Sequence, residues 1–297
     1  MSIALDGILD GAIDLHCHSG PSPFPRKIDH VEAAQQAQSV GMRAIVVKSH
    51  HHSTVMDVRA MASRLAGCRT QVFGGIALNA QVGGLNAAAV DMALAMGGKV
   101  VWFPTISATR HVAHAKAHPD LKFPKATVAL RPTRTIDILT PAGDLVPEVG
   151  PILSLIAASG AVLAGGHMAP DQIAALLAAA KKAGVTRMLV NHPEYVIEAD
   201  RKEVLAYADT GAIIEHSLCM YDDASTFYHW DVSLLKGWID LVGAERTSLG
   251  SDLGQEGNPL PIESFRKILD KLHDHGVSER DLHTMVRDNP ARLLGLN

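Results

Sequence analysis

Short apolar segments alternate with segments of helical pattern along most of the chain. The apolar segments predict β-strands at 12–18, 43–48, 72–78, 99–103, 161–167, 187–192, 212–216 and 247–252. The helical pattern follows them at 30–40, 54–66, 85–96, 147–159, 170–183, 200–209, 231–242, 261–275 and 278–287. Strands that are joined by crossover helices pair in parallel. The eight strands therefore predict an α/β fold of the (β/α)8 TIM barrel type.

A doubly wound open sheet is the alternative to the barrel. Such sheets often have a Gly-rich phosphate-binding loop after the first strand. Here the first predicted strand ends in His16-Cys17-His18 instead. This difference favours the barrel.

The alternation is interrupted once, after the fourth predicted strand. Residues 105–146 contain four prolines and several basic residues. Their pattern predicts a short helix at 108–117 and a β-hairpin with strands at 125–131 and 135–140. An ordered insertion of this length is typical of a lid or an oligomer contact. We therefore expect a single barrel domain over 1–297 that contains this insertion.

The composition excludes several classes of protein. The chain has 297 residues, 47% apolar and 20% charged, which is ordinary for one soluble barrel. The net charge is −4 and no basic block occurs, so we do not expect nucleic acid as a partner. No apolar run is long enough for a membrane span, and residues 1–11 lack the pattern of a secretory signal. With three scattered cysteines, the sequence predicts a cytoplasmic protein, and its Ala-rich helices predict a homo-oligomer.

The first predicted strand contains a pair of histidines. Asp14, His16 and His18 stand at alternate positions, which places them on one face of a strand. Two adjacent imidazoles pack poorly in a core because each has two ring nitrogens to satisfy. They are good ligands for a divalent metal, although two solvated histidines after a turn would give the same pattern.

Polar residues also end other predicted strands. In a TIM barrel, the residues that end the strands converge on one site at the C-terminal face. The strand-ending residues with suitable chemistry are His16, His18, Lys48, His167, His192 and Asp252. Four histidines and a carboxylate at the same end of successive strands are difficult to explain by packing. Their types predict a metal site.

This order of residues resembles the amidohydrolase superfamily over nearly the whole chain. The matching motifs are His-x-His on strand one, His on strands five and six, and Asp on strand eight. The resemblance implies a hydrolase with one or two divalent metals, usually zinc. It implies that His16 and His18 hold the more buried metal with Asp252. It further implies that His167 and His192 hold a second metal, or that His167 joins the first while His192 assists catalysis.

Strand four departs from the two-metal members of the superfamily, which commonly have a bridging carboxylated lysine or glutamate there. Residues 102–105 offer no such ligand, and Lys48 on strand two is the candidate substitute. A buried amine is partly deprotonated and can take up carbon dioxide to give an N6-carboxylated lysine. In the other interpretations, Lys48 stays charged and binds a substrate anion, or it extends to solvent.

The same residues predict the catalytic roles. A metal-bound water ionises near neutral pH. Asp252 is the expected general base and acid, with His192 and Lys48 as further catalytic residues. Asp14 is expected to orient a ligand or to accept a buried backbone hydrogen bond.

Other residues are expected to contact the substrate. We expect His50, Arg26, Arg131 and Tyr221 to line the pocket, although a solvated face for the arginines and loop packing for Tyr221 are equally compatible with the sequence. Glu215 and His216 end strand seven with opposite facing, so at most one of them points into the site.

The predicted function is hydrolysis of an amide, cyclic amide or ester (lactone) bond in a small molecule. The alternatives are a phosphoesterase of the polymerase-and-histidinol-phosphatase type, a metal-free lactonase or decarboxylase, and a binding barrel without activity. The phosphoesterases resemble this chain at residues 14–19 but usually have a late Asp-x-His pair, which Asp252-Leu253-Gly254 lacks. Asp252 also argues against pure binding, which needs no general base.

Overall fold

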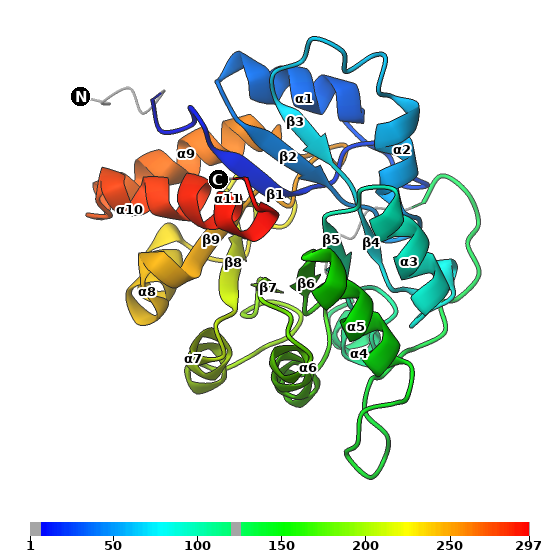
Figure 1. Ribbon diagram of the computed structural model, residues 1–297. Coiled ribbons are helices and arrows are strands. Elements are labelled where there is room, and N and C mark those ends of the chain that lie inside the picture. Colours follow the sequence, from blue (N-terminus) through cyan, green and yellow to red (C-terminus); the bar gives the residue numbers. More distant parts are fainter. Residues whose placement is uncertain (1–6, 120–125, 297) are drawn as a thin grey trace.

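Parallel strands form the centre of the protein, whose computed structural model describes residues 7–119 and 126–296 (Figure 1). The strands in these ranges are β1 (Ile13–Cys17), β2 (Ala44–Val47), β3 (Gln71–Phe73), β4 (Gly75–Ala77), β5 (Val100–Trp102), β6 (Val162–Ala164), β7 (Met188–Asn191), β8 (Ile213–Ser217) and β9 (Thr247–Gly250). One sheet contains β1, β2 and β3, and a second sheet contains the six strands from β4 through β9. In each sheet every strand pairs with the next one along the chain.

The two sheets together make one closed barrel. β3 and β4 are parts of one strand interrupted at Gly74, where a Cβ atom would come within 2.7 Å of the Thr54 and Val55 backbone. On the other side β1 lies beside β9, because the His18 N–H donates to the Leu253 carbonyl over 2.7 Å. The predicted strand at 72–78 therefore corresponds to β3 and β4, and the predicted barrel is confirmed.

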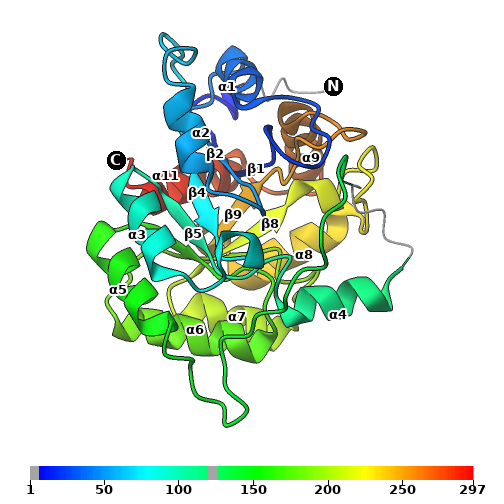
Figure 2. The ribbon, with the colours of Figure 1, turned by 90° about the vertical axis from the view of Figure 1, so that its right-hand side faces the viewer.

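Helices surround the barrel (Figures 1 and 2). In the described part of the chain they are α1 (His30–Ser39), α2 (Thr54–Ala60), α3 (Ala87–Ala95), α4 (Thr109–Ala117), α5 (Val149–Ser159), α6 (Pro170–Lys182), α7 (Arg201–Asp209), α8 (Val232–Val242), α9 (Pro261–Asp274), α10 (Glu279–His283) and α11 (Asn289–Leu294). Short 3-10 turns occur at Ala80–Val82, Leu218–Met220 and Ala244–Arg246, and a π turn at Thr284–Asp288. None of these helices has the length and hydrophobicity that crossing a membrane requires.

Local sequence determines where several helices begin. Asp29 and Asp200 form capping boxes with Glu32 and Glu203, which satisfy the free N–H groups at the starts of α1 and α7. Pro170 begins α6 at a position where no backbone N–H is needed. Each of these three helices therefore begins directly after the loop that follows a strand.

The end of the barrel at which the strands begin is filled by apolar side chains. Ile13, Ala44, Trp102 and other strand residues form one buried cluster with Leu293 and Leu294 of α11. A packed barrel interior excludes a ligand at this end. The polar strand ends therefore face the opposite, C-terminal end.

The insertion differs from the sequence-based expectation. The predicted helix at 108–117 is present as α4, but no hairpin pairs 126–131 with 135–140, and Lys125 lies outside the described residues. The backbone N–H groups of this segment bond to other loops. The Thr127 N–H donates to the Pro23 carbonyl over 2.9 Å, and the Ile136 N–H donates to the Ser107 carbonyl over 2.7 Å. Pro132 also lacks an N–H for a strand ladder. The segment thus runs back to the loop that follows β1.

Candidate active site

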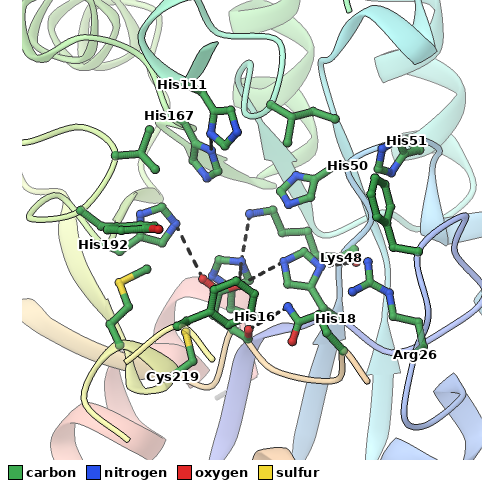
Figure 3. A pocket seen from close by; sticks show the side chains of 18 residues that line it. His16, His18, Arg26, Lys48, His50, His51, His111, His167, His192 and Cys219 are labelled. Carbon is green, nitrogen blue, oxygen red and sulfur yellow. Dashed lines mark hydrogen bonds and ion pairs between the residues drawn. The ribbon is translucent and has the colours of Figure 1, made fainter. Parts of the chain in front are cut away.

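A cavity of about 280 Å³ opens at the C-terminal ends of the strands (Figure 3). It is lined by His16, His18, Phe24, Arg26, Lys48, His50, His51, Ile106, His111, His167, His192, Tyr195, Val196, Cys219, Met220, Phe227, Asp252 and Gln255. The strand-ending residues predicted to converge are therefore all together in one cavity.

His16, His18 and Asp252 form the tightest group in this cavity. Asp252 Oδ1 lies 3.2 Å from His16 Nε2 and 3.1 Å from His18 Nε2. The opposite ring nitrogens are anchored: His16 Nδ1 lies 2.9 Å from Glu215 Oε1, and His18 Nδ1 lies 3.1 Å from the Lys48 carbonyl oxygen. An N–H on each Nδ1 directs the lone pair of each Nε2 toward Asp252. Two imidazole nitrogens and a carboxylate oxygen are thus poised around one point.

The backbone at this group is unusual. The pairing of β1 with β2 shifts by one residue between Asp14 and Cys17, so a β-bulge replaces strict alternation there. Asp252 has φ +54°, which is uncommon outside glycine. Its N–H donates to the His16 carbonyl over 2.7 Å. Asp14 serves this backbone, since it accepts hydrogen bonds from Ser251 and from the His16 N–H.

Burial sets the charge of these residues. It lowers the pKa of His16 well below its ordinary value and that of His18 to about 4, so both rings favour the neutral form that ligates metals. Burial alone would raise the pKa of Asp252, but the adjacent His16 and His18 imidazoles hold it below its usual range. The group therefore offers neutral nitrogens and an ionised oxygen.

His167 and His192 lie on the far side of this group. Their ring centroids are 4.9 Å apart, and His192 Nε2 is 3.9 Å from Asp252 Oδ2. His167 Nε2 and His192 Nδ1 are enclosed and have no hydrogen-bond partner. Burying such atoms unpaired costs free energy, as expected where a ligand completes the site.

Lys48 is fully enclosed at the bottom of the cavity. Its Nζ lies 2.9 Å from His16 Nε2 and 5.4 Å from the centre of the Trp102 ring. Burial lowers the pKa of its amine to about 8. Lys48 therefore does not extend to solvent, and its amine loses its proton more readily than the amine of an ordinary lysine.

The comparison with protein families assigns the chain to one of them. A family described as a family of unknown function, DUF6282, matches residues 11–215. The chain belongs to DUF6282. A comparison of this DUF6282 protein with the curated proteins finds no match.

Solved structures similar to this DUF6282 protein belong to the amidohydrolase superfamily, which confirms the predicted resemblance at the level of the fold. An amidohydrolase from Pseudomonas aeruginosa has a TM-score of 0.65 and 12% identity, over 99% of this chain and 98% of the other. A lactonase template engineered for organophosphate hydrolysis has a TM-score of 0.60 and 14% identity, over 96% of both chains. The phosphotriesterase homology protein from Escherichia coli, with phosphate in its active site, has a TM-score of 0.54 and 14% identity, over 96% of this chain and 98% of the other.

The cavity of this DUF6282 protein is also lined by His111, a histidine that the sequence did not predict there. His111 of α4 stacks on His167, with their Nδ1 atoms 2.9 Å apart (Figure 3). This contact leaves His167 Nε2 as the nitrogen available to a ligand. His111 lies in the predicted helix of the insertion, but no sequence rule states which face of an inserted helix turns toward a barrel.

Two expected substrate contacts are not brought into the cavity. Arg131 is exposed on the insertion. Tyr221 is buried behind the cavity wall, where its hydroxyl donates to Glu194 Oε1 over 2.7 Å. His50 and Arg26, by contrast, line the cavity. Of the two neighbouring residues in β8, Glu215 faces the site and His216 contacts Glu194.

Proposed function

We propose that this protein is a metal-dependent hydrolase that cleaves an amide, cyclic amide or ester (lactone) bond of a small molecule. The observation that carries the proposal is the convergence of His16 Nε2, His18 Nε2 and Asp252 Oδ1, with both histidines anchored through Nδ1. This donor set suits zinc. Structures of the same fold include an amidohydrolase and a lactonase template.

The residues fit one or two ions. His16, His18 and Asp252 would hold the first ion. The unpartnered Nε2 of His167 and Nδ1 of His192 offer further ligand atoms. His167 and His192 would hold a second ion, or His167 would join the first site while His192 assists the reaction.

Lys48 determines which arrangement applies. In the first alternative its neutral amine would add carbon dioxide and release a proton, and the oxygens of the resulting carbamate would serve as ligands for divalent cations. In the second alternative it stays an ammonium group and binds a substrate anion. Its enclosure and its contact with His16 are compatible with both roles.

The chain's own groups supply the proton transfers. A bound divalent metal lowers the pKa of water and polarises the bond under attack. Asp252 is ionised beside His16 and His18, so it would accept the proton of the attacking water and return it to the leaving group. His192 lies beside Asp252 Oδ2, where it orients that carboxylate. The aromatic rings of Phe24, Tyr195 and Phe227 line the same cavity and would displace water from it when a substrate binds.

Metal content per chain tests the proposal. Protein is produced with added zinc and bicarbonate as wild type, as Lys48→Ala, and as Lys202→Ala, a control at an exposed lysine. About two ions in wild type and one or none in Lys48→Ala support the carbamate and a two-metal hydrolase. About one ion in all three makes Lys48 a substrate contact. No bound metal in any of them contradicts the hydrolase and favours a metal-free lactonase, a decarboxylase or a binding barrel.

Phosphoester hydrolysis is the second candidate function, because one structure of this fold holds phosphate in its active site. The metal-loaded protein is assayed with matched carboxylic esters and phosphate esters. Faster turnover of the phosphate esters would replace the first proposal with the second.

A further inference from the structure

One cation at the cavity wall lacks a balancing charge. Arg26 donates through Nη2 to Ser22 Oγ over 3.1 Å, while its enclosed Nε has no partner. Among the described residues, no carboxylate forms an ion pair with it. A half-buried guanidinium that has no carboxylate in direct contact loses part of its hydration, which an anionic ligand would replace.

The loop that carries Arg26 is held in place before any ligand binds. The Gly20 N–H donates to the Ile28 carbonyl and the Lys27 N–H to the Gly254 carbonyl, over 2.8 and 2.9 Å. A backbone bridge pairs Arg26 with Gln255. A guanidinium on a fixed loop loses little conformational freedom when it binds an anion.

Two neutral polar groups stand beside Arg26 on the same wall. His51 Nδ1 is enclosed and has no hydrogen-bond partner, whereas the Gln255 amide N–H donates to the Asp252 carbonyl over 3.1 Å. Burial lowers the pKa of His51 to about 4, so its ring adds no second positive charge. We call Arg26, His51 and Gln255 the Arg26 corner.

The corner lies a short distance from the candidate metal ligands. The His18 and His50 ring centroids are 4.9 Å apart, and those of His50 and His51 are 6.3 Å apart. Figure 3 shows Arg26 and His51 on one side of the cavity, and His192 and Cys219 on the other. A group bound in the corner therefore lies in the same cavity as a bond held at His16 and His18.

The remaining wall is largely apolar. Ile106, Val196, Met220 and Phe227 contribute to the lining. Together with the size of the cavity, about 280 Å³, this wall suits a small apolar body and not an extended polar chain.

We propose that the substrate is a small carboxylic acid whose carboxylate binds in the Arg26 corner while its apolar body lies against Ile106, Val196, Met220 and Phe227. This inference rests on the proposed function, because the scissile bond would lie at His16, His18 and Asp252. A single planar guanidinium matches the single charge and planar shape of a carboxylate. A phosphate dianion would require a second cation, and none stands in the corner.

Binding of matched probes tests the corner. Benzoate and benzamide, and hexanoate and hexanamide, differ in the charge of one group and little in shape. Their dissociation constants are measured by calorimetry on zinc-loaded protein and again after zinc removal, because a carboxylate can also bind zinc. The variants are Arg26→Gln, Arg26→Lys and, as a matched control, Arg131→Gln at an exposed arginine of the insertion. Thermal unfolding confirms that each variant is folded.

Wild type and Arg131→Gln are expected to bind the carboxylates about tenfold to 100-fold more tightly than the amides, with or without zinc. Arg26→Gln is expected to abolish this difference, and Arg26→Lys to retain part of it while binding the amides normally. Equal preference in Arg26→Gln and wild type, or no preference in wild type, overturns the proposal. Tighter binding of phenyl phosphate than of benzoate overturns it in favour of a phosphate ligand. Since the preference persists without zinc, a failure of the hydrolase proposal is seen separately, in the metal content.

Discussion

Glu215 controls which nitrogen of His16 faces the cavity. Its Oε1 contacts His16 Nδ1 and also accepts from Asn191 Nδ2 over 2.7 Å. Carboxylates that hold the distant nitrogen of a metal-binding histidine fix both its tautomer and its orientation. Glu215 would therefore influence the proposed metal binding without being a ligand.

Replacing Glu215 is expected to weaken zinc binding. Glu215→Leu removes the acceptor at His16 Nδ1, and the zinc affinity should fall about tenfold to 100-fold, with a smaller loss in Glu215→Gln. Competition with a chromogenic chelator measures the affinity. Glu194→Leu is the control, because Glu194 makes a similar contact of 2.8 Å with His216, which lies outside the cavity. Equal losses in the two leucine variants would show that the effect is only structural.

Position in a barrel strand explains which single residues the sequence could predict. In a barrel the C-terminal ends of the strands all lie at one face, so residues that end strands come together there. The residues predicted on this basis are His16, His18, Lys48, His167, His192 and Asp252. Phe24, His111 and Tyr195 lie on loops or on the inserted helix. Their placement depends on loop packing between distant segments, for which the local pattern carries no signal.

At the scale of elements, α4 connects the insertion to the loop after β7. Arg110 Nε donates to the Val196 carbonyl over 3.1 Å, and its guanidinium pairs with Glu198. His114 Nδ1 lies 2.7 Å from Glu198 Oε1. Because His111 of α4 and Val196 both line the cavity, these contacts fix one part of its wall.

Loss of Glu198 is expected to loosen α4. Glu198→Gln removes the charge that faces Arg110, and since Glu198 is partly exposed, the effect should be at most about 1 kcal/mol, or roughly fivefold in local opening. Hydrogen exchange of the peptide that covers 109–117 measures this opening. Asp209→Asn, which breaks the exposed pair with Arg246, should leave that peptide unchanged. Unchanged exchange in Glu198→Gln would mean that the Val196 contact alone holds the helix.

The predicted and observed elements agree where burial dictates the pattern. The barrel strands and α4 occur where the apolar periodicity places them. The hairpin prediction was wrong because alternating residues in 126–140 resemble a strand, while their N–H groups bond to other loops. The break at Gly74 was also not predicted, since it arises from the close approach of Thr54, which is distant in sequence.

At the scale of the whole molecule, the cavity concentrates histidines that folding keeps neutral. Burial lowers the pKa of His18, His51 and His111 to about 4 in each case. Burial raises the pKa of Glu215 to about 8. These opposite shifts make the free energy of unfolding depend on pH in two directions.

The metal-free protein is expected to be most stable near neutral pH. Between about pH 4 and 6.5 the unfolded chain binds more protons than the folded histidines do, so stability falls on acidification, by up to about 1.4 kcal/mol per pH unit for a fully buried histidine. Above that range the folded protein retains the Glu215 proton, so stability declines again toward pH 8. Urea unfolding at about pH 5, 6.5 and 8 should give the highest midpoint at the middle value. A midpoint at about pH 5 equal to that at pH 6.5 would contradict the assignment of neutral buried histidines.

The closure of the barrel between β1 and β9 has a consequence for synthesis on the ribosome. Asp252 and Leu253, which complete the surroundings of His16 and His18, emerge more than 230 residues after them. During that interval the nascent chain lacks β9. The edge of β1 that later lies beside β9 is then open, and a chaperone can cover it. The order of the strands thus delays assembly of the group formed by His16, His18 and Asp252 until β9 has been made, and a fragment that ends before β9 lacks this group.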